Sequence, residues 1–226
     1  MISLYLQAPF ATFRTFTAGS YRPTAGFITP SAAYGLLLNV AGIEMRAENA
    51  RQPMTTIASG LPQARLAIGA IAFPAIHSIF QQVHNYPVGN TRKEHAPKTK
   101  GNKYNIQTAR RTFLTDIRAY LCVQAAPELE TAIVDGLKGN TNRRYGLPFL
   151  GDNSFLLDKL EVVDRLKPAH WFTPVASDVD QPPARITRLT ITIDRADMSQ
   201  TKSALFAPAA QPVEEIPEQA WVEVSY

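Results

Sequence analysis

Two segments in which apolar and polar residues alternate predict half-buried β-strands near the two ends of the chain. They cover residues 2–7 and 188–194. Longer runs rich in aliphatic and β-branched residues predict further strands at residues 66–73, 77–84, 111–124 and 156–163. The break at Pro74, between the first two of these runs, is typical of two separate strands or of a hairpin.

A segment with helical periodicity follows the first strand. Thr29 is a suitable N-cap, Pro30 suits the first helical position, and Gly42 suits the end. The apolar residues of this helix fall on one face, and they are Ala33, Leu36, Leu37 and Val40. Gly35 costs the helix about 1 kcal/mol relative to alanine. Its presence indicates either a close helix–sheet contact or room for a ligand or a partner's backbone.

A second helix is predicted at residues 128–137, with Pro127 near its start. The resulting order of strand, helix, strands, strand, helix and strand matches the β-α-β-β-α-β ferredoxin-like unit, which also underlies RNA-recognition modules. Segments predicted to lack regular structure are residues 8–23 (a loop), 168–183 (a proline-rich connector) and 207–217 (a loose tail). The pattern therefore predicts an α+β fold, with a ferredoxin-like domain at residues 1–165 and a small C-terminal β extension at residues 166–226 that has one strand and a tail.

Basic residues are concentrated in the first half of the chain. Residues 1–118 contain 13 Lys or Arg against four Asp or Glu, whereas residues 119–226 contain 10 against 15. Within the first half, residues 86–118 contain eight Lys or Arg against two acids. Such a stripe is typical of a surface that binds phosphates, although its simpler interpretation is a solvated loop without a partner. The asymmetry favours an oriented polyanionic partner such as nucleic acid.

The composition is that of a folded globular protein, because 45% of the 226 residues are hydrophobic and 19% are charged. The single cysteine, Cys122, lies in an apolar run, so an intrachain disulfide is excluded and a cytoplasmic setting is expected. No apolar run is long enough to predict a membrane-spanning helix, and the first residues do not have the pattern of a signal peptide.

Sequence motifs for metal, nucleotide and acyl-transfer chemistry are absent. The four histidines are scattered, and there is no CxxC, HExxH, GxSxG, GxxxxGK[ST] or GxGxxG pattern. We therefore expect no metal and no cofactor. His95 lies among lysines and could act as a general base with cationic support, although a histidine in such a loop more often only adds to the basic surface.

Five short segments carry a family resemblance. They are residues 8–14 (APFATFR), 20–23 (SYRP), 29–37 (TPSAAYGLL), 110–116 (RRTFLTD) and 145–153 (YGLPFLGDN). Together they resemble the CRISPR-associated protein 5 family. The helix sequence PSAAYGLL and the turn FLG are the most specific motifs, and the run LPFLGDN is most similar to the Myxococcus-type (DevS-like) branch. The resemblance covers most of residues 1–165.

The resemblance implies a ferredoxin-like (RRM-like, RAMP) domain with a basic thumb hairpin or loop inserted at about residues 86–110. It implies a non-catalytic subunit of a type I CRISPR Cascade surveillance complex, a ribonucleoprotein of antiviral defence that recognises DNA with a guide RNA. This subunit binds the 5′ handle of the guide RNA (crRNA) and caps the filament next to the large subunit. The expected partners are the crRNA handle, the filament-forming subunit, the large subunit and, through the complex, target DNA. No membrane partner is expected.

Candidate RNA-binding residues combine cations for phosphates with aromatic and polar groups for splayed bases. They are Arg14, Tyr21 and Arg22 before the first helix; Ser31, Tyr34 and Asn39 on its face opposite the apolar stripe; Arg92, Lys93, Lys98, Lys100, Asn102 and Lys103 in the thumb; and Arg110, Arg111, Arg143 and Arg144. Several have simpler alternatives. The two tyrosines could be core aromatics with a hydrogen-bonded tip, Arg14 could pair with an acid, and the last two arginines could lie at the end of the second helix.

The turn at residues 149–153 departs from the family pattern. Many relatives have a basic residue directly after the Leu-Gly pair, whereas this chain has Asp152. That acid argues against a phosphate-binding role for the turn itself, and Gly151 is expected to be a turn residue first.

A nuclease function is the main alternative. One branch of the family cleaves precursor RNA without metal by means of Tyr, Lys and His side chains. The groups that could supply this chemistry here are Tyr21 or Tyr34, Lys93 or Lys100, and His95. They do not align position by position with that branch, and in the branch that the chain resembles most a separate subunit processes the RNA. We therefore favour an RNA-binding scaffold over a metal-independent pre-crRNA endoribonuclease. The third alternative is a basic ribonucleoprotein component unrelated to CRISPR.

Overall fold

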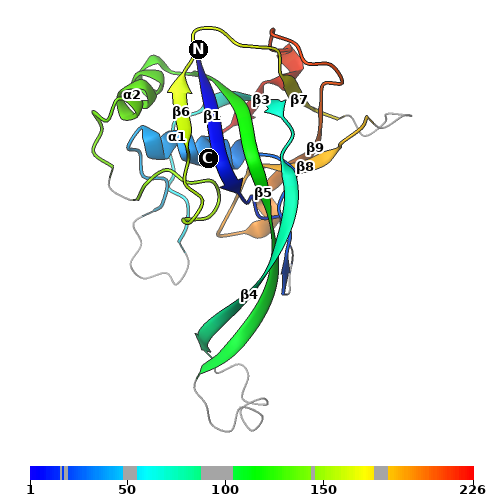
Figure 1. Cartoon of the computed structure of the whole chain (residues 1–226). Coiled ribbons are helices and arrows are strands. Elements are labelled where there is room, and N and C mark those ends of the chain that lie inside the picture. Colours follow the sequence, from blue (N-terminus) through cyan, green and yellow to red (C-terminus); the bar gives the residue numbers. More distant parts are fainter. Residues whose placement is uncertain (16, 18–19, 48–54, 88–103, 144–145, 176–182) are drawn as a thin grey trace.

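Ten strands of the described chain are hydrogen-bonded into one sheet (Figure 1). The computed structural model describes residues 1–15, 17, 20–47, 55–87, 104–143, 146–175 and 183–226. The strands are β1 (Ile2–Ala11), β2 (Tyr21–Arg22), β3 (Ala64–Ala72), β4 (Ala75–Pro87), β5 (Tyr104–Ala125), β6 (Lys159–Val162), β7 (His170–Pro174), β8 (Thr187–Thr192), β9 (Lys202–Pro208) and β10 (Val222–Val224). The α-helices are α1 (Pro30–Val40) and α2 (Pro127–Leu137), and short 3-10 helices cover η2 (Met198–Gln200) and η3 (Glu218–Ala220).

The sheet is mostly antiparallel. Its strands follow one another in the order β6-β1-β5-β3-β7-β9-β8, while β10 pairs with β3, and β2 and β4 pair with β5. β5 lies between β1 and β3 and is antiparallel to both, and β6 is antiparallel to β1 on the other side. Only β2 among these pairs runs parallel to its neighbour in the described chain. With its two helices the protein is α+β, as the sequence predicts.

Alternation along the central strands divides their side chains between two faces. Leu4 and Leu6 of β1 and Leu121 of β5 are at most 1% exposed and belong to the main core, which α1 and α2 cover. The neighbouring residue Cys122 points to the opposite face and joins a smaller cluster around Trp171. Burial, opposed by a weaker hydrogen bond to Ser3, raises the pKa of the Cys122 thiol to about 11. Cys122 is therefore a packed core residue that stays protonated at neutral pH.

The first helix forms where the sequence predicts it. Thr29 Oγ1 accepts the N–H of Ala32 at 3.2 Å, Pro30 occupies the first helical turn, and Gly42 has a φ of 76° just after the end. α2 begins at Pro127, also as predicted. Both helices have 11 residues. In the described part of the chain no helix is long and apolar enough to cross a membrane.

β4 and the first half of β5 form a long hairpin, here called the arm, that projects from the rest of the molecule (Figure 1). Its pairing runs from Ala75↔Thr115 at the base to Pro87↔Tyr104. The strands predicted at residues 77–84 and 111–124 are therefore confirmed, and both are longer than predicted. Because β5 continues into the centre of the sheet, the arm and the core share one strand. Residues 88–103, at the centre of the predicted thumb, lie outside the described residues.

Several segments predicted to be irregular are strands. β1 continues to Ala11, and β2 lies within the predicted loop at residues 8–23. The predicted proline-rich connector contains β7, where Trp171 is fully buried. The predicted loose tail begins inside β9, and Val213 forms a bridge with Ala169. The C-terminal part was therefore predicted wrongly as one strand and a tail. β7 and β10 are held by β3, which lies far away in the sequence, and a local pattern does not reveal such partners.

Candidate nucleic-acid interface

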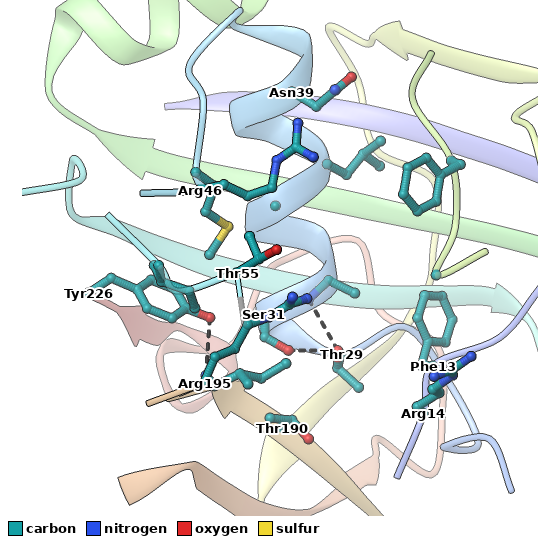
Figure 2. Close-up of a pocket in the computed structure, with 18 of the residues that line it drawn as sticks. Phe13, Arg14, Thr29, Ser31, Asn39, Arg46, Thr55, Thr190, Arg195 and Tyr226 are labelled. Atoms are coloured by element: carbon teal, nitrogen blue, oxygen red, sulfur yellow. Dashed lines mark hydrogen bonds between the residues drawn. The ribbon is translucent and has the colours of Figure 1, made fainter. Parts of the chain in front are cut away.

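A cavity of about 840 Å³ lies beside α1. The segments that line it are residues 12–14 after β1, residues 29–39 of α1 and its cap, residues 43–46 and 55–57, the turn at residues 146–153, and residues 190–195 with Tyr226. In Figure 2, Phe13 and Arg14 lie on one side of α1 and Arg195 and Tyr226 on the other, with Thr29 and Ser31 between them. Cavities of about 300–1,000 Å³ are typical of ligand sites, so this one has room for nucleotide units.

α1 lines the cavity with two polar side chains, Ser31 and Asn39, and also with Ala32, Gly35 and the apolar Leu36. Ser31, Gly35 and Asn39 follow one another at intervals of four residues, and all three line it. Ser31 is 7% exposed, and its Oγ lies 3.0 Å from Thr29 Oγ1 in a hydrogen bond. Of the described residues, a Cβ added at Gly35 would meet only Met45, whose Sδ would lie at 3.7 Å, an ordinary contact. Gly35 is thus not required by a close helix–sheet contact, and the alternative that it leaves room for a ligand fits the structure.

Tyr34 does not lie on this face, so the prediction that it contacts RNA is wrong. It is 1% exposed, its hydroxyl donates to the Pro62 carbonyl oxygen at 2.6 Å, and its ring stacks on Tyr226 with centroids 5.5 Å apart. Burial, with the charge of Tyr226 acting in the same direction, raises the pKa of Tyr34 to about 12. Tyr34 is buried because it lies on the same side of the helix as Leu37 and Leu38, which are buried and follow it by three and four residues. Tyr34 is a core aromatic with a hydrogen-bonded tip.

Among the described residues that line the cavity, the charged ones are three arginines and one glutamate. Arg46 is held by Glu44 through N–H donors 2.8 and 2.9 Å from the two carboxylate oxygens. Arg14 and Arg195 are both exposed, and they lie on opposite sides of α1 (Figure 2). An anion in the cavity would therefore meet cations from two directions, which suits a phosphodiester chain.

The turn at residues 149–151 forms one end of the cavity by packing onto the end of β1. The Thr12 N–H donates to the Leu150 carbonyl oxygen at 3.1 Å. Gly151 has a φ of 76°, and a Cβ at this position would overlap the Thr12 carbonyl oxygen. Gly151 is therefore a turn residue, as expected, and its missing side chain lets the turn touch β1. Phe149 and Gly146 of the same segment also line the cavity.

Asp152, the residue that departs from the family pattern, binds Arg111. The Arg111 Nη2 lies 2.6 Å from Asp152 Oδ2, and the two side chains are 15% and 21% exposed. Burial favours a higher pKa for the Asp152 carboxyl, but hydrogen bonds from Ser154 and Arg111, with the charge of Arg111, hold this pKa below its ordinary value. The guanidinium also lies 5.6 Å from the centre of the Phe155 ring. Arg111 thus fixes the turn to the arm, and a phosphate there would have to compete with Asp152.

Four predicted RNA-binding residues meet where β2 pairs with β5, in the registers Tyr21↔Arg110 and Arg22↔Arg111. On the other side of β5, Phe80 of β4 is the partner of Arg110. Because registered partners project to the same face of a sheet, Tyr21, Arg110 and Phe80 form a row across three strands, here called the arm row. Tyr21 is 52% and Phe80 is 63% exposed, so the alternative that Tyr21 is a core aromatic is wrong.

Three threonines, two of them buried, connect the cavity to the arm row. Thr112 of β5 accepts the Thr24 N–H on its Oγ1 at 2.7 Å, and its carbonyl oxygen accepts the Thr12 hydroxyl at 3.1 Å. Thr24 Oγ1 accepts the Phe13 N–H at 2.8 Å. These bonds fix both ends of the segment that carries Arg14, Tyr21 and Arg22. The structure thus joins Arg14, which lines the cavity, to Tyr21 and Arg22 beside β5 through one segment that is held at both ends.

The remaining predicted residues are placed elsewhere or lie outside the described residues. Arg143 Nη2 donates to the Gly136 carbonyl oxygen at 3.1 Å, which agrees with the alternative that this cation serves the end of α2. The predicted residues outside the described part of the chain are Arg92, Lys93, Lys98, Lys100, Asn102, Lys103 and Arg144. His95 lies outside it as well. Among the described residues, no group of three His, Cys, Asp or Glu side chains is placed to hold a metal ion.

Sequence reasoning missed four residues of this surface: Arg46, Phe80, Arg195 and Tyr226. The only local signal was at Phe80, a large apolar residue in a strand next to polar glutamines. Arg195 and Tyr226 reach the cavity from segments that follow β8 and β10. Their place depends on long-range strand pairing, so no local pattern could have identified them.

Comparisons with known proteins agree with the sequence resemblance. A family model described as CRISPR-associated protein (Cas_Cas5) matches residues 1–162. Among solved structures, a chain described as "CRISPR RNA-guided surveillance complex" is similar with a TM-score of 0.58 and 13% identity, over 97% of this chain and 95% of that chain. A chain described as "Crystal structure of Cas protein" has a TM-score of 0.52 and 15% identity, over 96% and 97%. A search of curated proteins found no match.

Proposed function

Because the chain belongs to the CRISPR-associated protein 5 family, we propose that it is a non-catalytic subunit of a type I CRISPR Cascade surveillance complex and binds the 5′ handle of the guide RNA. The observation that carries this proposal is the cavity beside α1, where Arg14 and Arg195 flank the small polar face of Ser31, Gly35 and Asn39. Single-stranded RNA needs cations for its phosphates and narrow surfaces for its unstacked bases. This cavity offers both.

The arm row extends this surface. Tyr21 and Phe80 place exposed rings on either side of Arg110. Neighbouring strands lie about 4.8 Å apart, so the two rings are separated by roughly 10 Å with the cation between them. Aromatic rings with an intervening cation suit two bases and the phosphate that joins them. In our proposal the handle occupies the cavity and the arm contacts the RNA where the handle meets the spacer.

The strand order supports the finer description of the fold as ferredoxin-like. The sequence order β1, α1, β3, β5, α2 and β6 corresponds to β-α-β-β-α-β, and these four strands stand in the spatial order β6-β1-β5-β3. This is the antiparallel arrangement in which the first and third strands are central. In this description the arm is an insertion between the second and third strands of the unit.

Exposed apolar residues on the arm support contacts with neighbouring proteins. Ile76, Ile79 and Ile106 are 60%, 45% and 52% exposed. Isolated domains rarely gather so many large apolar side chains on one projecting element. We propose that the filament-forming subunit and the large subunit cover these side chains, so that the chain caps the filament and contacts target DNA through the complex.

A scaffold role is favoured over RNA cleavage by the state of one candidate catalytic group. A phenol with a pKa raised to about 12, whose hydroxyl is committed to a backbone carbonyl, is a poor acid or base at neutral pH. Tyr34 therefore does not supply this chemistry. Metal-independent cleavage remains the alternative, since it would then depend on Tyr21 with a lysine and His95 of the thumb.

The proposal is tested by incubating the protein with repeat RNA in EDTA and analysing the mixture on native and denaturing gels. We expect a shifted band on the native gel and intact RNA on the denaturing gel. Absence of a shift at any protein concentration would overturn RNA binding. A discrete cut at the base of the repeat hairpin would instead identify the nuclease, and His95→Ala would be the next variant.

Charge variants then assign the surface. Arg14→Ala should weaken binding and reduce the slope of log K against log salt by about 0.7, the value for one lost phosphate contact on a single strand. Arg165→Ala is the matched control, because its side chain is 84% exposed and it does not line the cavity. The triple variant Lys98→Ala, Lys100→Ala and Lys103→Ala should reduce the slope by roughly 2. An unchanged slope would remove the thumb from the contact surface.

A further inference from the structure

The cavity beside α1 is completed by residues that follow the segment matched by the family model. That segment ends at residue 162, whereas Arg195 and Tyr226 belong to the C-terminal part. Both line the cavity, as do Thr190 and Ile193. Figure 2 shows Arg195 and Tyr226 across α1 from Arg14. The C-terminal part therefore forms a wall of the site.

The ring of Tyr226 is fixed before any ligand arrives. One face stacks on Tyr34 with centroids 5.5 Å apart and an interplanar angle of 26°. The hydroxyl oxygen accepts the N–H of Ile193 at 3.2 Å. Tyr34 is itself fixed, because its hydroxyl donates to the Pro62 carbonyl oxygen. A ring that is held at its tip and on one face loses little conformational freedom when a second ring stacks on it.

Arg195 supplies a cation next to this ring. It lies in the segment that continues from Ile193, whose N–H holds the Tyr226 hydroxyl, and its side chain is exposed. An aromatic platform beside an arginine matches a nucleotide unit, in which a base and its phosphate lie a few ångströms apart. The opposite wall, with Arg14, would meet the next phosphate of a chain.

We propose that Tyr226 and Arg195 form a nucleotide subsite of the cavity, in which a base of single-stranded RNA stacks on Tyr226 and its phosphate binds Arg195. The subsite rests on the proposed function, since it requires RNA to enter this cavity. It adds that the C-terminal part, and not only the family-matched segment, determines how the RNA is held.

The test compares the binding of repeat RNA by the full chain and by four variants, with each variant's thermal unfolding measured in parallel. The variants are Tyr226→Leu, Tyr226→Phe, Arg195→Ala and, on the opposite wall, Arg14→Ala. Tyr226→Leu, which removes the ring, should weaken binding between about fivefold and 150-fold, the range for loss of one base stack. Tyr226→Phe keeps the ring and should bind within about twofold of the native chain, because stacking needs no hydroxyl. Arg195→Ala should reduce the salt slope by about 0.7, whereas Tyr226→Leu should leave the slope unchanged.

The outcomes separate the subsite from the proposed function. If the native chain binds RNA and Arg14→Ala weakens binding, but Tyr226→Leu and Arg195→Ala bind like the native chain, the subsite is wrong and the function stands. If the native chain binds no RNA, the proposed function fails first. Should Tyr226→Leu unfold, the salt slope of Arg195→Ala decides, because this exposed side chain can be removed without disturbing the core.

A competition experiment distinguishes an RNA chain from a free nucleotide. Adenosine 5′-monophosphate at 1 mM should not displace the RNA, since it lacks the neighbouring phosphate that would meet Arg14. The proposal would be overturned if the mononucleotide displaced RNA from the native chain but not from Tyr226→Leu or Arg195→Ala. That result would show that the subsite binds small nucleotides instead.

Discussion

Replacing Gly151 by alanine should separate the packing of the 149–151 turn from the ordinary cost of a left-handed backbone. At φ 76°, any residue with a Cβ is strained by about 1–2 kcal/mol. A Cβ at Gly151 would in addition overlap the Thr12 carbonyl oxygen, far inside the 3.0 Å limit for real Cβ contacts. The turn or the end of β1 must therefore move. Gly139 provides the matched control, because its φ is 81° and no residue that the structure describes lies within 4 Å of an added Cβ.

The expected loss of stability follows from the hydrogen bond and the packing that this movement disrupts. The Thr12 N–H is bonded to the Leu150 carbonyl oxygen at 3.1 Å in a region where Thr12 is 3% exposed. Leaving a buried donor unsatisfied costs about 1–3 kcal/mol, and overpacking costs about as much again. We expect Gly151→Ala to lower the free energy of unfolding by roughly 3–5 kcal/mol and Gly139→Ala by about 1 kcal/mol.

Urea unfolding at 25 °C measures the difference, with tryptophan fluorescence as the signal. Trp171 is fully buried and should report the loss of the core. Midpoints give the free energies provided that the slope m stays the same in both variants. A difference of less than 1 kcal/mol between the two variants would refute the close contact between the turn and β1. A variant of Gly151 that still folds should also bind RNA more weakly, because the turn lines the cavity.

Three further changes test other parts of the surface. Gly35→Ala should stabilise the protein by about 0.5–1 kcal/mol, since it sits inside a helix, and should weaken RNA binding by narrowing the cavity; thermal unfolding and gel shifts measured on the same preparation check both effects. Tyr34→Phe should cost about 1–2 kcal/mol, because the Pro62 carbonyl oxygen loses its donor, yet leave RNA affinity unchanged; a loss of affinity in a folded variant would return Tyr34 to the binding surface. Asp152→Asn removes a carboxylate whose folded-state pKa is held below its unfolded value near 3.8. The stability that the pair with Arg111 contributes is therefore present above the unfolded pKa and is lost as the pH falls through the folded pKa. The stability difference between the native chain and Asp152→Asn should therefore be largest at neutral pH and shrink below about pH 4 in urea titrations; a difference that is constant from pH 7 to pH 3 would count against the ion pair.

Local elements could be read from the sequence because their determinants are local. The cap at Thr29, Pro30 at the first turn and the helical spacing of Ser31, Gly35 and Asn39 depend only on residues within a few positions of one another. Tyr34 could not be assigned in this way, because tyrosine has both an apolar ring and a polar tip. Its burial is decided by Tyr226 and Pro62, which lie far away in the sequence.

The C-terminal strands and the second wall of the cavity could not be predicted for a related reason. β7 contains His170 and Pro174 and is only five residues long, so its alternation is too short to stand out. It becomes a strand because Phe172 pairs with Pro208 and Gly69 with Trp171. Arg195 and Tyr226 are brought to the cavity by such pairings. Their chemistry was visible in the sequence, but their position was not.

Uncharged threonines hold in place the segment that carries several of the arginines of this surface. The segment between Arg14 and Arg22 carries three of the predicted RNA contacts, and its ends are held by Thr24 on the backbone of Phe13 and by Thr112 on the backbone of Thr24. Thr112 belongs to β5, the strand that also forms the arm. Thr112 is buried, with 7% of the residue exposed. A change in the cavity wall and a change in the arm would therefore both disturb this one residue. If RNA binds as we propose, its contacts in the cavity and on the arm row should therefore not be energetically independent, because Thr112 is bonded to both Thr12 and Thr24.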